Sequence, residues 1–280
     1  MSFCVIATFK NESEIMEEWL THYVNEGCEK FYLIDNGSTD NYQDCFAKYS
    51  DMICIVNDPT IHGQPQLYNT HFLDKIHIHK WVVLCDLDEF IYSRRQYKTM
   101  KTYLESLEDL NISEISIPWK MFGANGFNTL ESKGPASVIK YFTKRTDYNK
   151  NNGFQGVKEI LGDIKMILCK SIVKSETLQK LDIHFHHYSG SGSQILSNND
   201  IVLTKNSPFV PTNESLLEYS CLHLNHYAIR SLDWFCRTKI GRCCAASSAD
   251  DNVRTLEYYH AFDVVSNDID DFELNNKSYF

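Results

Sequence analysis

Two aspartates separated by one residue follow an apolar run in the first half of the sequence. Asp86 and Asp88 come directly after Trp81–Cys85, a run whose length and composition predict a buried strand. Residues i and i+2 of an extended segment point the same way, so both carboxylates can bind one cation, directly or through water. Carboxylate oxygens suit Mg²⁺ or Mn²⁺, and such a cation can neutralise a diphosphate leaving group.

The residues around this pair decide between a metal site and a structural turn. Asp-x-Asp alone is weak evidence, because it also occurs on solvated loops. Here apolar Phe90 and Ile91 follow the acidic run, and charge between two apolar runs is costly unless it is paired or bound to metal. We therefore favour the metal site over a salt-bridged structural turn.

Two further polar clusters follow apolar runs nearer the N-terminus. Residues 8–12 follow a predicted strand at Phe3–Thr8, and residues 35–40 follow another at Lys30–Ile34. The second cluster, Asp35-Asn36-Gly37-Ser38-Thr39-Asp40, is also good turn sequence, so physical reasoning alone leaves a turn and a nucleoside-binding site evenly matched.

Histidines gather in the second half of the chain. His184 and His186 alternate along Leu181–Tyr188, which we predict to be a strand, so they would share one face. With His223 and His226 they could form a zinc site, but no Cys-rich or His-Glu-x-x-His pattern supports a zinc hydrolase. We predict that most of these histidines are structural, and that one is a candidate for an extra metal or phosphate ligand.

The elements that must position these residues alternate between strands and helices. A helix is predicted to start at Asn11, with Glu14 completing a capping box, and to end at Gly27. Another strand is predicted at Met52–Val56, and Pro65 suits the first turn of the helix that follows. This alternation predicts an α/β fold with a mostly parallel central sheet and helices on both faces. Ligands on such sheets bind beyond the carboxyl ends of the strands, where the polar clusters lie.

The second half of the sequence is less regular. Strands are predicted at Ile115–Trp119 and Ile164–Val173, and a late helix is predicted to begin after Ser231 and to end at Gly241. The tail from Asp263 onward is acidic and has little periodic pattern.

The composition limits the classes of function. The 280 residues are 43% hydrophobic and 13% aromatic, enough for one large domain or two joined halves. A net charge of -10 disfavours a broad surface for nucleic acid or anionic membrane. No apolar run is long enough to cross a bilayer, and the ten scattered cysteines favour reduced thiols in a cytosolic protein. Cys243-Cys244 has no assigned role.

Several segments, taken in order, carry a family resemblance. Between about residues 3 and 241 the sequence resembles glycosyltransferase family 92 and related family-2-like enzymes. The segments are NESE with EEWL (11–20), FYLIDNGSTDN (31–41), WVVLCDLDEF (81–90), WKMFGANG (119–126), KSIV (170–173), the His-rich stretch and LNHYAIRS (224–231).

The resemblance implies a GT-A fold and a transfer reaction. It implies one continuous catalytic domain in which residues 1–118 form the nucleotide-sugar-binding half, and residues 119–280 form a smaller acceptor-binding half with C-terminal helices. It also implies that a sugar moves from a nucleotide diphosphate sugar, usually a UDP sugar, to a hydroxyl of an oligosaccharide or glycoprotein acceptor. The reaction would be an inverting single displacement that depends on Mn²⁺ or Mg²⁺.

The resemblance also assigns roles to matching positions. Thr8 and Asp35 would flank the nucleoside, Asp86 and Asp88 would meet ribose, metal and diphosphate, and His226 would be the remaining metal ligand. Arg230 stands where the family often has Lys, which preserves a diphosphate contact. The donor-binding candidates are Thr8, Lys10, Asp35, Asn36, Gln66, Asn69, Asp86, Leu87, Lys170 and Arg230, and the metal ligands are Asp86, Asp88 and His226.

The sequence departs from the family pattern between Gly126 and Lys158, where the acceptor residues and the general base are expected. An inverting transfer needs a carboxylate near the acceptor hydroxyl. Glu131, Asp147 and Glu159 are the candidates, and position alone favours Glu159.

Many family members are anchored in membranes, whereas this sequence shows no anchor. It looks closer to the short soluble enzymes of large DNA viruses of algae that build their own glycans, with xylose as the first candidate sugar and the host cytoplasm as the expected location.

Two other classes of function compete with this reading. One is a catalytically inactive nucleotide- or carbohydrate-binding module, against which the intact acidic run argues. The other is a metal-dependent nucleotidyltransferase or phosphohydrolase, which would need further acidic ligands and a triphosphate-binding loop that the sequence does not show.

Overall fold

The computed structural model describes most of the chain. It covers residues 3–130, 137–150, 157–161, 164–200, 207–241 and 253–279, and for residues 157–161 and 164 it gives the backbone alone.

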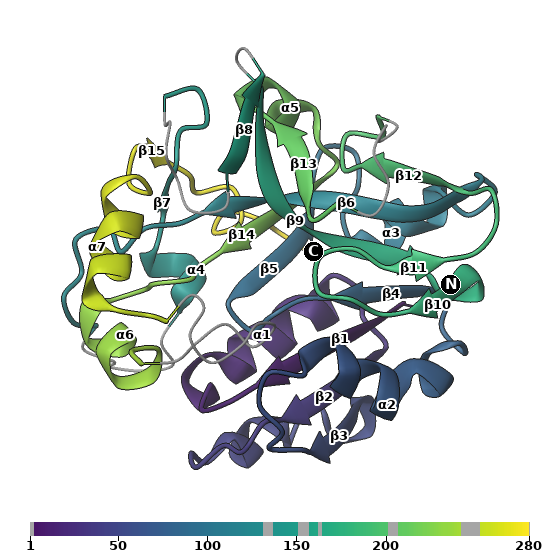
Figure 1. The fold of residues 1–280 in the computed structure, drawn as a ribbon, viewed down its shortest axis with the longest axis horizontal. Helices are drawn as coiled ribbons and strands as arrows, with labels where there is room; N and C mark the ends of the chain where they lie inside the picture. Colours follow the sequence, from purple (N-terminus) through teal and green to yellow (C-terminus); the bar gives the residue numbers. More distant parts are fainter. Residues whose placement is uncertain are drawn as a thin grey trace.

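The strands are spread along the whole chain (Figure 1). They are β1 (Phe3–Phe9), β2 (Lys30–Asp35), β3 (Ile53–Asn57), β4 (Trp81–Leu84), β5 (Glu89–Ser93), β6 (Ile112–Met121), β7 (Lys144–Arg145), β8 (Val157–Leu161), β9 (Ile164–Lys174), β10 (Leu178–Lys180), β11 (His187–Tyr188), β12 (Ser193–Leu196), β13 (Phe209–Thr212), β14 (Leu222–His226) and β15 (Ile269–Asp270).

Most of these strands belong to one curled sheet. Its main path runs in the order β3-β2-β1-β4-β9-β6-β14-β5, with β12 paired to β6 and with β13 and β8 paired to β9. Strand β1 is parallel to β2 and to β4, and β6 is parallel to β14, while β9 is antiparallel to both of its neighbours on the path. The fold is therefore α/β with a mostly parallel central sheet, as the alternating pattern predicted.

The described helices lie between strands along the chain. They are α1 (Ser13–Asn25), α2 (Gln64–Ile76), α3 (Met100–Ser106), α4 (Val138–Tyr141), α5 (Glu214–Tyr219), α6 (Leu232–Thr238) and α7 (Leu256–Val264), with 3₁₀ turns at Tyr42–Phe46, Ser50–Met52 and Ser175–Thr177.

The first two helices cover opposite faces of the parallel strands. Trp19 of α1 packs with Val5 and Val83 in the larger apolar cluster. Phe72 of α2 packs in a second cluster with Ile6, the neighbour of Val5 in the same strand. Because successive strand residues point to opposite faces, this division places one helix on each side of the sheet, and it explains the almost continuous apolar sequence of these strands.

The predicted capping box of Asn11 and Glu14 is wrong. Asn11 has a φ of 54°, and its side-chain oxygen accepts a hydrogen bond from Thr39 N at 2.7 Å. The first turn of α1 is capped from outside the helix, because Ser13 N donates to Asp40 Oδ2 at 2.8 Å. The turn after β2 thus fixes the start of α1.

The predicted strand at Leu181–Tyr188 is also wrong for most of its length. His187 and Tyr188 alone form the short strand β11, which pairs with β10. Before it, Asp182 Oδ1 accepts from Ile183 N at 2.7 Å, and Asp182 N donates to His186 Nδ1 at 3.2 Å. Such side-chain bonds to nearby backbone compete with the strand ladder, so His184 and His186 do not alternate along a strand.

The described helices contain no candidate for a membrane span: none is both long and apolar enough.

Candidate functional site

Several strands of the sheet end at the same edge. Since β1, β2, β4, β6 and β14 run parallel, their carboxyl ends at Phe9, Asp35, Leu84, Met121 and His226 lie along one rim. The acidic run begins just beyond β4. The sequence clusters predicted to converge therefore do meet at this rim.

Asp86 is held on this rim by two partners. Its Oδ2 lies 3.0 Å from Lys170 Nζ, and its Oδ1 accepts from Gln64 Nε2 at 3.1 Å. Burial alone would raise the pKa of Asp86, but the charge and the hydrogen bond of Lys170, together with His226, hold the pKa below the ordinary value. Lys170 is fully buried in β9, so this carboxylate and this ammonium form one fixed pair at the strand end.

Glu89 shapes the turn that presents the aspartates. Its Oε2 accepts from Asp86 N at 2.8 Å and lies 3.6 Å from Lys170 Nζ. Trp19 Nε1 donates to the backbone oxygens of Asp86 and Glu89, at 3.1 and 3.2 Å. The side chain of Glu89 is fully buried, and these contacts hold the loop in place.

Asp88 lies between a histidine and a lysine. Its Oδ1 is 3.6 Å from His226 Nε2, and its Oδ2 is 2.9 Å from Lys239 Nζ. Burial would raise the pKa of Asp88, but Lys239, His226 and Arg230 together hold it well below the usual range. The carboxylate is therefore ionised at neutral pH and faces positive charge on one side.

Arg230 and Glu12 extend this cluster toward the N-terminal helix. Arg230 Nη2 lies 3.4 Å from Glu12 Oε2, and the guanidinium stacks over the Trp234 ring at 4.0 Å. Arg230 has a φ of 48°, a region that residues other than glycine seldom adopt. Both Glu12 and Arg230 are buried, so this pair is a fixed part of the rim.

His226 is a neutral imidazole in an aromatic setting. Burial lowers the pKa of His226 to about 4, although Asp88 opposes the shift. Its ring lies 4.3 Å from the Trp119 ring, and Trp119 in turn lies 5.5 Å from His184. His226 Nδ1 is buried and has no hydrogen-bond partner among the described residues.

Asp88 and His226 fit a divalent cation held by two protein ligands. A cation bound to both would lie about 2.0–2.2 Å from each atom, which the 3.6 Å between Oδ1 and Nε2 permits. Within the described ranges, however, no group of three or more His, Cys, Asp and Glu side chains is arranged around a metal position. A cation here would need other ligands, such as water or a bound diphosphate, to complete its coordination.

Three of the predicted donor-binding residues make structural hydrogen bonds. Asp35 accepts from Ser38 N, Tyr42 OH and Asn57 Nδ2. Asn36 Nδ2 donates to two backbone oxygens after β3. Asn69 exchanges hydrogen bonds with the backbone of Leu181. These bonds shape the rim, and they leave the predicted donor contacts of Asp35, Asn36 and Asn69 as predictions.

The other predicted donor-binding residues lie at varying depth. Thr8 is half-buried near the end of β1, Leu87 is buried inside the acidic run, and Lys10 and Gln66 are exposed. On α2 it is Gln64, two residues before the predicted Gln66, that donates a hydrogen bond to Asp86. Gln64 and Lys239 are the site residues that sequence reasoning missed.

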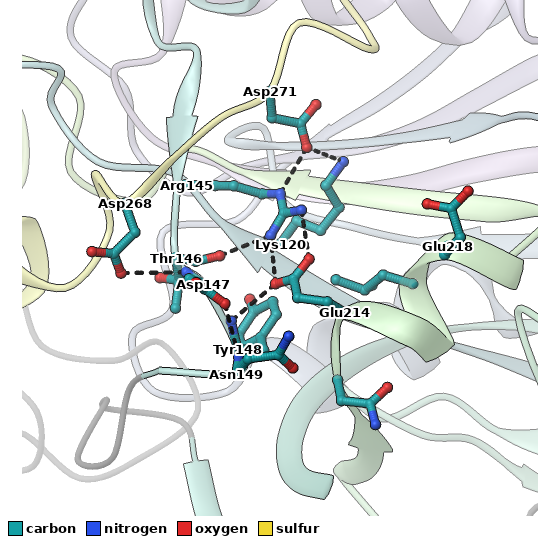
Figure 2. Close-up of polar contacts among 12 residues, drawn as sticks. Lys120, Arg145, Thr146, Asp147, Tyr148, Asn149, Glu214, Glu218, Asp268 and Asp271 are labelled. Carbon is teal, nitrogen blue, oxygen red and sulfur yellow. Dashed lines mark hydrogen bonds and ion pairs between the residues drawn. The ribbon is translucent and has the colours of Figure 1, made fainter. Parts of the chain in front are cut away.

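Of the three candidate bases, only Asp147 has a side chain that the structure describes. Glu131 lies outside the described residues, and of Glu159 the structure describes only the backbone, within β8. Asp147 accepts from Asn149 N at 2.9 Å, and its Oδ2 lies 3.3 Å from Lys150 Nζ. Figure 2 shows Asp147 in the polar network around Arg145, and none of the contacts described for it joins it to Asp86 or Asp88.

The zinc alternative finds no support in the placement of the histidines. His223 Nδ1 lies 2.9 Å from Glu273 Oε2 and 3.1 Å from Lys120 Nζ. Neither of these partners contacts Asp88 in the contacts described for it. His186 is fully buried, and its backbone N donates to Glu114 Oε1. Both histidines therefore have structural surroundings, as predicted for most of this group.

Comparisons with known proteins agree with the chemistry of the rim. The model of the family described as Glycosyltransferase family 92 matches residues 1–228, more than half of the chain. A search of curated proteins finds no match.

Two solved structures match parts of the chain at low similarity. One is a UDP-glucose pyrophosphorylase complexed with UDP-glucose, at 8% identity and a TM-score of 0.28, with 63% of this chain and 71% of that chain covered. The other is a Bacillus anthracis protein described as a glucose-1-phosphate thymidylyltransferase in complex with sucrose, at 10% identity and a TM-score of 0.30, with 48% and 61% covered. These scores are too low to bear on function.

Proposed function

Since the chain belongs to glycosyltransferase family 92 and is thus a glycosyltransferase, we propose that it is a metal-dependent enzyme that uses a nucleoside diphosphate sugar. The donor is a UDP sugar, the acceptor is a hydroxyl of an oligosaccharide or glycoprotein, and the displacement is a single inverting step. In this proposal residues 1–118 bind most of the donor, and residues 119–280 bind the acceptor.

The observation that carries the proposal is the pairing of acids and bases on one rim. Asp88 lies between His226 and Lys239, and Asp86 lies against Lys170. A diphosphate needs positive charge around it, and its metal needs oxygen and nitrogen ligands. This rim offers both kinds of group beside the carboxyl ends of β4 and β14.

The residues of this rim divide into metal ligands and diphosphate contacts. Asp88 and His226 would hold Mn²⁺ or Mg²⁺, with Asp86 close by toward the ribose and metal. When bound, this cation would offset the charge that develops on the departing diphosphate. Lys170 and Arg230 are buried cations that pair with Asp86 and Glu12, and they would donate hydrogen bonds to the diphosphate oxygens.

The acceptor side needs one carboxylate to take the proton of the attacking hydroxyl. Glu159 is our first candidate, and Glu131 and Asp147 are the alternatives. Glu159→Gln should lower kcat strongly and leave the dissociation constant of UDP unchanged, because the residue would act on the acceptor rather than the donor. If Glu159→Gln keeps full turnover, Glu131→Gln and Asp147→Asn are tested in the same way.

We extend the proposal to the sugar and the setting. UDP-xylose is the first donor to test, and the host cytoplasm of a virus-infected alga is the setting we propose.

The test is a donor panel with three metal conditions. The protein is incubated with UDP-, GDP- and dTDP-sugars in Mn²⁺, Mg²⁺ or EDTA, and released nucleoside diphosphate is measured with and without glycan acceptors. We expect diphosphate release with a UDP sugar and a divalent cation, an increase on adding an acceptor, and loss of release in EDTA.

The rival functions give different products. Normal nucleotide binding without turnover for any donor would indicate an inactive binding module. Release of nucleoside monophosphate or pyrophosphate would indicate a phosphohydrolase or a nucleotidyltransferase. Transfer at full rate in EDTA would contradict the metal part of the proposal and leave the transfer reaction itself in place.

A further inference from the structure

A lysine from the second half of the chain lies against the carboxylate that we assign to the metal. Lys239 Nζ is 2.9 Å from Asp88 Oδ2 and 3.7 Å from Glu12 Oε1, and its side chain is 20% exposed. Lys239 follows the last turn of α6 and lies 151 residues from Asp88 in the sequence. It reaches the rim over the Trp234 ring, 5.5 Å from its centroid.

This ammonium and a divalent cation would compete. Asp88 offers one oxygen to His226 and the other to Lys239. A cation on Asp88 and His226 would lie within a few ångströms of the Lys239 ammonium, in a buried setting where like charges repel strongly. The metal can therefore bind Asp88 without this repulsion only if Lys239 moves away or pairs with another anion.

The surrounding charges indicate which anion Lys239 could find. Glu12 is already shared between Lys239 and Arg230, so it cannot neutralise both cations by itself. A diphosphate bound beside the metal would supply the missing negative charge. Metal alone would leave Lys239 with only its share of the Glu12 charge, whereas metal and diphosphate together would pair every group.

We propose that Lys239 is a tethered cation that occupies Asp88 in the metal-free enzyme and moves to the diphosphate when the metal and the donor bind together. Lys239 is thus a positioning residue that makes metal binding depend on the nucleotide. This inference rests on the proposed function, because the metal and the diphosphate belong to it.

The inference predicts a coupling between two ligands that can be measured without catalysis. Mn²⁺ is titrated calorimetrically into the wild-type protein and into Lys239→Met, with and without saturating UDP. We expect wild-type protein to bind Mn²⁺ weakly alone and at least about tenfold more tightly with UDP, within the usual range of such couplings. In Lys239→Met, Mn²⁺ alone should bind about tenfold more tightly than to wild type, and UDP should add much less.

Two further variants act as controls. Lys239→Arg keeps a cation and should keep the weak binding of Mn²⁺ in the absence of UDP. Lys48→Met removes an exposed lysine that pairs with Glu17 and should leave both Mn²⁺ affinities unchanged. Far-ultraviolet circular dichroism and thermal unfolding check that all variants are folded.

The outcomes separate this inference from the proposed function. Equal or weaker Mn²⁺ binding in folded Lys239→Met would overturn the inference, as would Lys239→Arg behaving like Lys239→Met. No Mn²⁺ binding to any variant, with or without UDP, would overturn both the inference and the metal part of the proposed function. The predicted Mn²⁺ affinities in a protein that transfers no sugar would support the inference and count against the proposed function.

Discussion

Asp88 is ionised and the neighbouring His226 is neutral, and both states leave a lone pair for a cation. The Lys239 ammonium is the main influence that offsets burial and keeps the pKa of Asp88 low. Burial is the main influence that lowers the pKa of His226 to about 4. At neutral pH the pair is therefore an anionic oxygen beside a neutral nitrogen, and both have a lone pair available for a cation.

Asp88→Asn tests this pair directly. The amide cannot replace a charged ligand, so we expect kcat/KM for sugar transfer to fall by about 10²–10³-fold, the usual loss for one preorganised electrostatic group. Donor turnover is measured beside thermal unfolding, and Asp51→Asn, on an exposed 3₁₀ turn, is the matched control. A folded Asp88→Asn protein with wild-type turnover would show that Asp88 does not hold the metal.

Site residues could be predicted from the sequence only where a recognisable local pattern points to them. Asp86 and Asp88 follow a strand whose apolar run is visible, and the structure brings both to the rim with His226 and Arg230. Lys239 could not be found in this way, because its contact with Asp88 depends on where α6 ends in space. Gln64 was missed for a similar reason, since the first turn of α2 decides which side chain faces Asp86.

At the scale of elements, a buried carboxyl helps to join β6 to the segment before β11. Glu114 of β6 is fully buried, and its Oε1 accepts from His186 N at 3.2 Å. Burial raises the pKa of Glu114 to about 7, although hydrogen bonds from Ser171 and His186 oppose the shift. The segment that failed as a predicted strand is thus held by polar contacts that no alternating pattern encodes.

Glu114 makes stability depend on pH in a defined direction. The folded protein keeps this proton up to about pH 7, whereas the unfolded chain releases it near the ordinary glutamate pKa of 4.5. The stabilising contribution is therefore complete below pH 4.5 and is lost as pH rises through 7. Glu114→Gln should remove this dependence, so that between pH 5 and pH 8 the variant gains roughly 2.5 kcal/mol relative to wild type.

Thermal or urea unfolding of both proteins at pH 5 and pH 8 measures this difference. Glu176→Gln, at an exposed position of the 3₁₀ turn after β9, is the control and should follow wild type. A Glu114→Gln protein with the same pH dependence as wild type would mean that Glu114 is ionised in the folded state.

The acidic tail is ordered because it neutralises buried cations. Strand β15 pairs with β7, and Asp271 beyond it lies 2.6 Å from Lys120 Nζ and 2.8 Å from Arg145 Nε. Arg145 also forms a two-pronged ion pair with Glu214 (Figure 2). The sequence of the tail shows no periodic pattern, because the cations that Asp271 pairs with, Lys120 and Arg145, lie more than 100 positions before it.

Asp271→Asn should destabilise the protein strongly. It leaves the Lys120 ammonium, whose side chain is 1% exposed, without its nearest carboxylate, and breaking a buried ion pair on one side costs roughly 3–5 kcal/mol. The midpoint of urea unfolding should fall accordingly. Asp270→Asn, the exposed neighbour in β15, should stay within about 0.5 kcal/mol of wild type, and equal midpoints for the two variants would contradict this account.

At the scale of the whole molecule, the two halves of the sequence are interleaved in one sheet. Strand β9 lies between β4 and β6, and β14 lies between β6 and β5. The alternating pattern of the first half allowed the parallel strands and their helices to be predicted. The insertion of β9 and β14 could not be, because strand pairing over such separations is set by packing of the complete chain and leaves no local signal.

This interleaving predicts that residues 1–118 do not fold alone. Without β9 and β14, β4 would have an open edge and β5 would lose β14, its partner in the described sheet. Both edges would expose fully buried residues such as Val82 and Phe90, which favours aggregation. We expect fragment 1–118 to lack cooperative thermal unfolding and protected amides, and the full chain to unfold in one transition. A soluble fragment 1–118 that melts cooperatively and binds UDP would instead show that the nucleotide-binding half is an independent domain.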